Sequence, residues 1–194
     1  MSSPFNKDRE NQNEDTVSLF DDNGRSLECY VEHSLETDGI IYLLLMPVDI
    51  PVVIISWDND DPEVEEVDAV ILEDELEIID IFANAKAVLA EHNLYLKHSA
   101  HTLTATGELP PIEEEQILTL DLDEEDDELD TEELQLLASF YHSHQKYSVY
   151  TPLTPLLFFA RYNTKGKLEL VSPEEEGFQP ILEELLFEEL DDRN

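Results

Sequence analysis

Three histidines come closest to a metal-binding pattern in this chain. His92, His98 and His101 are close in sequence, and the pair in His98-Ser-Ala-His101 has a spacing that occurs among zinc ligands. Two further ligands would have to converge on this pair, and the only cysteine, Cys29, is distant in sequence. We therefore interpret the histidines as exposed side chains on a hairpin. A metal-dependent regulator or enzyme that uses the His98 and His101 region is the alternative.

Two acidic runs have the oxygen-rich chemistry that calcium prefers. They are Asp58–Asp61 and Asp121–Glu128, and both lack the glycine and the ligand spacing of an EF-hand loop. Weak, nonspecific binding of divalent cations is expected. A calcium sensor is not.

Catalytic motifs are missing from the sequence. We find no nucleophile elbow, phosphate-binding glycine loop or dinucleotide fingerprint, and the chain has five glycines in all. Paired carboxylates carry no signal because there are 48 Asp and Glu residues to choose from. The sequence therefore predicts a noncatalytic protein without a cofactor.

The net charge of −38, with only 10 Lys and Arg residues, restricts the possible partners. Phosphate backbones and anionic lipids need clustered cations, so direct nucleic-acid binding and membrane insertion are not expected. A basic protein surface is the partner that such a field would attract. Two alternatives remain: the charge only keeps the protein soluble, or the chain imitates nucleic acid in a basic groove.

Cysteine content and the N-terminal residues bear on localisation. One cysteine allows no internal disulfide, which fits a reducing, cytosol-like compartment. Residues 1–14 are polar, lack the pattern of a signal or transit peptide, and are expected to form a disordered lead. The longest apolar runs are too short to span a bilayer.

An internal repeat predicts the architecture. Tyr42-Leu-Leu-Leu-Met-Pro47-Val-Asp-Ile-Pro51, followed by four large apolar residues, returns as Tyr147-Ser-Val-Tyr-Thr-Pro152-Leu-Thr-Pro155, again followed by four. The offset between Tyr42 and Tyr147 is 105 residues. We therefore expect an α+β protein with mainly antiparallel sheet, built as an internal duplication of two related β-meander-plus-helix units.

The first unit is expected over residues 15–92. Its Asn23-Gly24 turn is a strong hairpin signal between two strand-like runs. A helix over Asp74–Glu91 is predicted because Ile78, Phe82, Ala85 and Leu89 recur at helical spacing. The expected strands are Thr16–Phe20, Leu27–His33, Ile40–Met46, Val52–Trp57 and Ala69–Leu72.

An extra hairpin over residues 93–107 and a proline- and glutamate-rich linker over residues 108–116 precede the second unit, residues 117–191. Leu134–Tyr141 has a helical pattern, but the repeat offset predicts a strand there. Ser172-Pro173-Glu174-Glu175 has the pattern of a capping box and predicts the start of the last helix, with Pro180 kinking or restarting it. The other expected strands are Leu118–Leu122, Lys146–Tyr150, Leu156–Tyr162 and Lys167–Val171.

The residues Leu19-Phe-Asp-Asp-Asn-Gly24, Glu28-Cys-Tyr-Val31 and Tyr42–Pro47 resemble the small acidic YrzB-type domain of unknown function found in many bacteria. With Tyr147–Arg161 added, the chain is similar to a longer cyanobacterial and plastid family, called domain of unknown function 3727. The resemblance implies a cyanobacterial cytosol or plastid stroma and a role around photosynthetic complexes. It supplies no catalytic residues.

The apolar strands are the candidate binding elements. Val52–Ile55 and Leu156–Phe159 are apolar on both faces, and one helix for each unit covers only one face. The remaining face can be buried by the other unit or by the extra hairpin, and a docking groove for a basic partner is the alternative. The oligomeric state is left open. The candidate partner-binding residues are Trp57, Phe158 and Phe159 as anchors, with Asp123, Glu124, Glu125, Asp126, Asp127 and Glu128 as an acidic rim.

Overall fold

The computed structural model describes residues 16–57, 69–121 and 131–191. The lead expected over residues 1–14, the acidic run Asp58–Asp61 and the acidic rim Asp123–Glu128 lie outside these ranges. All strand pairs in the described ranges are antiparallel, and two helices accompany them, so the α+β prediction is confirmed. No helix in the same ranges is long and apolar enough to cross a membrane.

The chain forms two compact units that do not follow the linear order of the sequence. One unit, here called the terminal unit, combines the residues up to Val48 with those from Leu156 onward. The other, the central unit, runs from Asp49 to Pro155. This division differs from the expected boundaries of residues 15–92 and 117–191.

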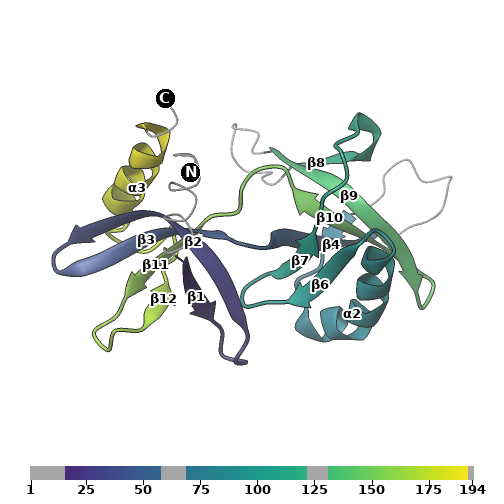
Figure 1. Cartoon of the computed structure of the whole chain (residues 1–194), viewed down its shortest axis with the longest axis horizontal. Coiled ribbons are helices and arrows are strands. Elements are labelled where there is room, and N and C mark those ends of the chain that lie inside the picture. The colour runs from purple at the N-terminus through teal and green to yellow at the C-terminus, as the bar shows by residue number, and fades with distance from the viewer. Residues whose placement is uncertain (1–15, 58–68, 122–130, 192–194) are drawn as a thin grey trace, which may run out of the picture. The chain divides into compact units, whose positions relative to one another are not determined.

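The terminal unit has a five-stranded sheet and the helix α3 (Figure 1). Its strand order is β1-β2-β3-β11-β12, so that strands from both ends of the chain lie side by side. The elements are β1 (Thr16–Phe20), β2 (Ser26–Thr37), β3 (Ile40–Pro47), β11 (Phe158–Tyr162), β12 (Leu168–Leu170) and α3 (Gln179–Asp191).

The central unit has a seven-stranded sheet with the order β6-β7-β4-β10-β9-β8, and β5 pairs with β4 beside this path. The helix α2 belongs to this unit (Figure 1). The elements are β4 (Ile50–Trp57), β5 (Ala69–Ile71), α2 (Glu75–Ala90), β6 (Leu94–His98), β7 (Leu103–Gly107), the 3-10 turn η1 (Glu114–Gln116), β8 (Ile117–Asp121), β9 (Thr131–His142) and β10 (Gln145–Pro152).

Most local predictions are confirmed. The segment Leu134–Tyr141 is a strand within β9, although its own pattern is helical. The hairpin over residues 93–107 is β6 paired with β7, and Gly24 adopts a φ of 80° in the turn between β1 and β2. The linker includes η1, and the Gln135 side chain donates a hydrogen bond of 3.0 Å to the Pro110 carbonyl oxygen. A strand of the sheet therefore holds part of the linker.

The expected meander is wrong at one connection in each half of the chain. A meander would pair β3 with β4 and β10 with β11. Instead β3 pairs with β11, with Tyr42 opposite Arg161, and β10 pairs with β4, with Tyr147 opposite Ser56. Each sheet therefore takes strands from both halves.

The connection between β3 and β4 explains why the strands do not turn back. Only Val48 and Asp49 separate Pro47 from Ile50, and tight two-residue hairpin turns need positive φ values. Neither Val48 nor Asp49 adopts one. Prolines at positions 47 and 51 also favour extended backbone at the residues before them. The chain thus continues out of one sheet and into the other.

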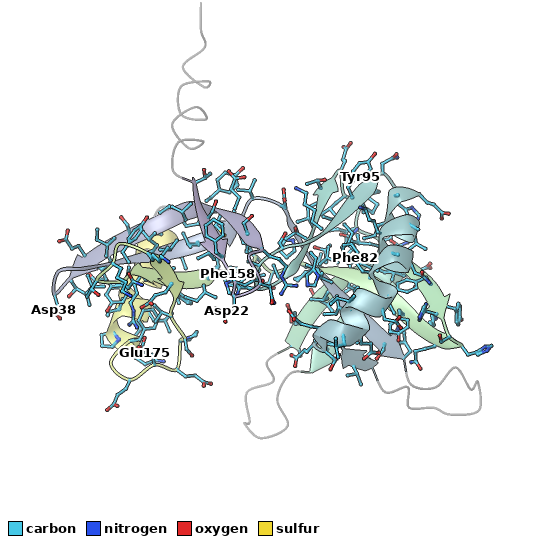
Figure 2. The ribbon with its side chains drawn as sticks, turned by 90° about the horizontal axis from the view of Figure 1, so that it is seen from below. Asp22, Asp38, Phe82, Tyr95, Phe158 and Glu175 are labelled. Carbon is cyan, nitrogen blue, oxygen red and sulfur yellow. The ribbon has the colours of Figure 1, made fainter. Side chains whose placement is uncertain are left out.

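The predicted start of the last helix is wrong. Ser172 does cap a turn, because its hydroxyl accepts a hydrogen bond of 3.3 Å from the Glu174 amide. However, α3 begins only at Gln179, after Gly177 with a φ of 82°. The Glu175 carboxylate binds the Arg161 guanidinium at 3.0 and 3.1 Å instead of completing a capping box (Glu175 is labelled in Figure 2). Pro180 accordingly lies in the first turn, where its missing N–H costs little.

Both faces of the terminal sheet are buried, and different elements cover them. Tyr42 and Leu44 on β3 pack under α3 with Phe178 and Leu185. The alternating residues Leu43 and Leu45 point to the opposite face and are also buried. The edge strands β1 and β12 approach each other, so the sheet curls around this second face. Curvature, rather than a second helix, buries the other side of these strands.

Cys29 lies in this curled sheet and is fully buried. Burial, with a smaller effect from Glu28, raises the pKa of its thiol to about 12. Because the thiolate is the reactive form, we expect no alkylation of the native chain by iodoacetamide at pH 8 within an hour. The urea-unfolded chain, as the control, should be alkylated completely, as measured by intact mass. Rapid modification of the native chain would show that this sheet opens readily.

Candidate functional site

The predicted histidine site does not assemble into a metal centre in the described part of the chain. The His98 ring stacks on Phe82, with 5.9 Å between ring centroids and 25° between planes. His101 is exposed, with a φ of 66° at the tip of the β6–β7 hairpin. No group of three or more His, Cys, Asp or Glu side chains among the described residues is placed to hold a metal ion.

The predicted anchor Trp57 is half-buried at the boundary between β4 and β10. Its indole N–H donates a hydrogen bond of 3.0 Å to the Ser148 hydroxyl, which lies 2.8 Å from the Ser139 hydroxyl. The ring packs against a small core that includes Ile55 and Tyr150. This environment gives Trp57 a structural role, and its contact with a partner stays a prediction.

The two predicted phenylalanine anchors are also half-buried. Phe159 meets Phe178 edge to face, with ring centroids 5.6 Å apart, and belongs to the core under α3. Phe158 occupies the other face of β11, opposite Leu45 on β3 (Figure 2). Phe158 and Phe159 therefore lie on opposite faces of β11 in the terminal unit, and Trp57 belongs to the central unit. Their partner-binding role remains untested.

Exposed apolar residues are found instead on the outer face of α2. Leu76 is 78% exposed and Ile79 is 60% exposed, one helical turn apart. The inner face of the same helix buries Ile78, Ile81, Ala85 and Leu89. The helical spacing in the sequence predicted only this inner stripe. A second stripe at positions 76, 79 and 83 was visible in the sequence and could have identified the outer face.

The helix begins where the sequence dictates. Asp74 is the N-cap, and its carboxylate accepts a hydrogen bond of 3.0 Å from the Glu77 amide. Glu75 and Glu77 in the first turn suit the positive end of the helix dipole. Leu76 therefore lies in a capped first turn, and Ile79 follows directly on the next one.

Three side-chain contacts fix α2 on β9 and β10. The Tyr147 hydroxyl donates to the Glu77 carboxylate at 3.0 Å, and His142 Nε2 lies 3.1 Å from the Asp80 carboxylate. The Asn84 side-chain amide lies 3.3 Å from His142 Nδ1. Leu76 and Ile79 are thus presented on a helix that is held at two successive turns. A preorganised face loses less entropy on binding than a mobile one.

Carboxylates flank the exposed pair in the sequence. Glu73, Glu75 and Asp80 are exposed and lie within four residues of Leu76 or Ile79, and Lys86 is the one basic residue of α2. An apolar centre with an acidic rim is the arrangement that would accept an apolar group carried on a basic surface. We call Leu76 and Ile79 with these three carboxylates the α2 face.

Tyr95 on β6 offers a comparison within the same unit. It is 57% exposed (Figure 2). Its neighbours on the strand, Leu94 and Leu96, belong to the core beneath α2. Because side chains alternate along a strand, Tyr95 faces away from the sheet side that α2 covers. It is therefore not part of the α2 face.

Comparisons with known proteins match families without an established function. The family model described as Protein of unknown function (DUF3727) matches residues 93–189, which is half of the chain. Residues 22–90 are similar to the family described as Protein of unknown function (DUF1292). No curated protein and no solved structure matches. The boundary between the two matched segments lies just after α2. Strands from both segments pair in each of the two sheets.

The contact between Tyr147 and Glu77 predicts how stability depends on alkaline pH. Burial, followed by this hydrogen bond, raises the pKa of Tyr147 from 10.0 to about 12. Between these two pKa values, Tyr147 keeps its proton in the folded chain and loses it in the unfolded chain. The free energy of unfolding therefore falls as pH rises through this range. Tyr147→Phe should be less stable by about 1 kcal/mol at pH 8. The difference should shrink as pH approaches 12.

Urea unfolding at several pH values would measure this effect. Tyr95→Phe is the matched control, because Tyr95 is exposed, and its stability should follow that of the native chain at every pH. A difference between Tyr147→Phe and the native chain that is constant up to pH 12 would contradict the proposed link between proton binding and the α2 contact.

Proposed function

We propose a protein-binding role for this chain, which belongs to the family described as Protein of unknown function (DUF3727). It is a noncatalytic acidic binding or assembly factor that recognises a basic protein partner. The observation that carries the proposal is the α2 face, where Leu76 and Ile79 are exposed on a fixed helix among carboxylates.

The apolar pair supplies the part of binding that slows dissociation. Burying a leucine or isoleucine side chain contributes roughly 1.5–3 kcal/mol, and a few such residues usually dominate an interface. A single exposed leucine would need no explanation. Two large apolar side chains on successive turns of one helix form the start of an anchor for a partner helix or loop.

Charge supplies the part of binding that speeds association. The net charge of −38 produces a field that attracts a basic surface over about 8–10 Å in physiological salt. Opposite charges at the rim raise the association rate more than they raise the final affinity. The carboxylates of the α2 face and the acidic run Asp123–Glu128 both contribute to this field.

The remaining parts of the proposal concern the setting. The resemblance to a cyanobacterial and plastid family favours a partner around photosynthetic complexes, in the cyanobacterial cytosol or the plastid stroma. The metal-dependent alternative would need ligands beyond His98 and His101. No such group of three is found among the described residues.

Affinity capture from native cells at low and moderate salt, followed by kinetics with the purified partner, tests the role. The double variant Leu76→Gln and Ile79→Gln keeps helix-forming side chains and should dissociate at least about fivefold faster, while its association rate changes less than about twofold. Tyr95→Thr, an equally exposed change on the same unit, is the matched control and should leave both rates unchanged.

Salt separates the electrostatic half of the proposal from the apolar half. The association rate should fall steeply between about 0.01 and 0.15 M salt, where the screening length shrinks from about 30 to 8 Å. Native chain and double variant should show the same salt dependence. Capture of no partner at any salt would overturn the role, and unchanged dissociation of the double variant would remove the α2 face from it.

A further inference from the structure

We propose that this chain is a covalently linked, strand-exchanged pair of equivalent halves, in which each half completes the sheet of the other. The first half contains β1 to β5 and α2, and the second contains β8 to β12 and α3. The inference is independent of the proposed binding role. It rests on three correspondences between the halves.

The first correspondence is the pairing across the exchange. Tyr42 on β3 lies opposite Arg161 on β11. Moving from Tyr42 forward by the repeat offset gives Tyr147, and moving from Arg161 back by the same offset gives Ser56. Tyr147 on β10 does lie opposite Ser56 on β4. The two exchanged strand pairs therefore have one common register.

The second correspondence is an irregularity in the sheet. The β2–β3 ladder shifts between Val31 and His33, which leaves Glu32 without an opposite residue. The β9–β10 ladder shifts between Val149 and Tyr150, which leaves Leu137 without one. The repeat offset relates Glu32 to Leu137. A bulge can be placed anywhere along two long strands, so its return at the same position is strong support for equivalence.

The third correspondence is in the side chains of the two repeat tyrosines. Tyr42 of the first half packs on Phe178, just before α3 of the second half, with 5.8 Å between ring centroids. Tyr147 of the second half donates its hydrogen bond to Glu77 on α2 of the first half. Each tyrosine thus fixes the helical segment that the opposite half contributes.

Exchange explains why the two halves need each other. If each half folded alone, β4 would have to lie beside β3, with Ser56 opposite Tyr42. In that register Pro47 would lie opposite Pro51, and only Val48, Asp49 and Ile50 would be left for the turn. None of the three adopts the positive φ that such a short hairpin loop uses, and a β-branched residue such as Val48 or Ile50 rarely does. Short connections that cannot close a hairpin are a known route to domain swapping. Here the exchange takes place within a single chain.

Cohesion of the halves therefore should not depend on the linker over residues 108–116. The halves are joined by β3–β11 and β4–β10 pairing and by the packing of α2 on β9 and of α3 on β2. Two independent sequential domains would be joined by the linker alone. Cutting the linker distinguishes these two arrangements.

The experiment places a protease site between Glu113 and Glu114 of the full chain, where the flanking side chains are exposed. After cleavage, light scattering should still give the mass of the intact chain, 22.3 kDa plus the inserted residues, while a denaturing gel shows two fragments. Two species of about half that mass in native buffer would overturn the proposal.

Trp57 provides a second measurement that needs no further substitution. It is the only tryptophan, and it lies where β4 of the first half meets β10 of the second. In the cleaved protein, its fluorescence should report a urea midpoint that falls on tenfold dilution, because unfolding then separates two chains. The uncleaved insertion protein is the control and should show no dependence on concentration. A concentration-independent midpoint after cleavage would count against exchange.

A second insertion, between Glu108 and Leu109, guards against a local effect of the first site. Both cleaved proteins should behave alike, since both sites lie in the same linker between the halves. Association after cleavage at one site and separation at the other would overturn the proposal, because it would place the cohesion in the linker contacts of Gln135.

Discussion

A short, proline-flanked connection determines the organisation of this protein. Val48 and Asp49 link β3 to β4 without the positive φ values that a two-residue hairpin requires, and prolines stand at positions 47 and 51. The Val48 amide even extends the pairing with β2, since it donates to the Glu28 carbonyl oxygen at 3.0 Å. The strand therefore leaves its sheet in an extended conformation, and its continuation must find a partner elsewhere. Strands from the other half of the chain provide that partner in both sheets.

This exchange also accounts for strands that are apolar on both faces. An apolar run such as Val52–Ile55 would be an aggregation hazard if one face stayed open. In the central unit, Val52 and Ile54 enter the core beneath α2, and Ile55 enters a second core with Leu134 and Tyr150. Ile55 belongs to the first half of the chain, whereas Leu134 and Tyr150 belong to the second. The second core therefore cannot form before the halves meet, so folding of the two halves should be strongly coupled.

Sequence patterns predicted the helices and strands better than they predicted which strands pair with each other. Helix α2, the β6–β7 hairpin and strand β9 were all identified, because helical spacing and strand-like runs are properties of neighbouring residues and the repeat offset relates the two copies of the repeat. Which strand lies beside β3 is decided by the backbone at Val48 and Asp49, and hydrophobic periodicity carries no information about that. The start of α3 failed for a related reason: Glu175 prefers the Arg161 guanidinium, which comes from β11 and is distant in sequence. Leu76 and Ile79 were not predicted, because the helical spacing that predicted α2 is that of its buried stripe, and exposure of the second stripe depends on what packs against the helix.

The strong negative charge of the chain bears on the exposure of the apolar pair Leu76 and Ile79. Self-repulsion at a charge of −38 opposes compact folding, and the described part of the chain has few basic residues with which to offset it. In the proposed role, that repulsion would keep copies of the chain apart while two large apolar side chains are exposed on α2. A basic partner would reverse the balance, because it would remove the repulsion and cover the apolar pair in one event. The same charge that disfavours contact with another copy of the chain would then favour the proposed partner, and Leu76 and Ile79 would slow its dissociation.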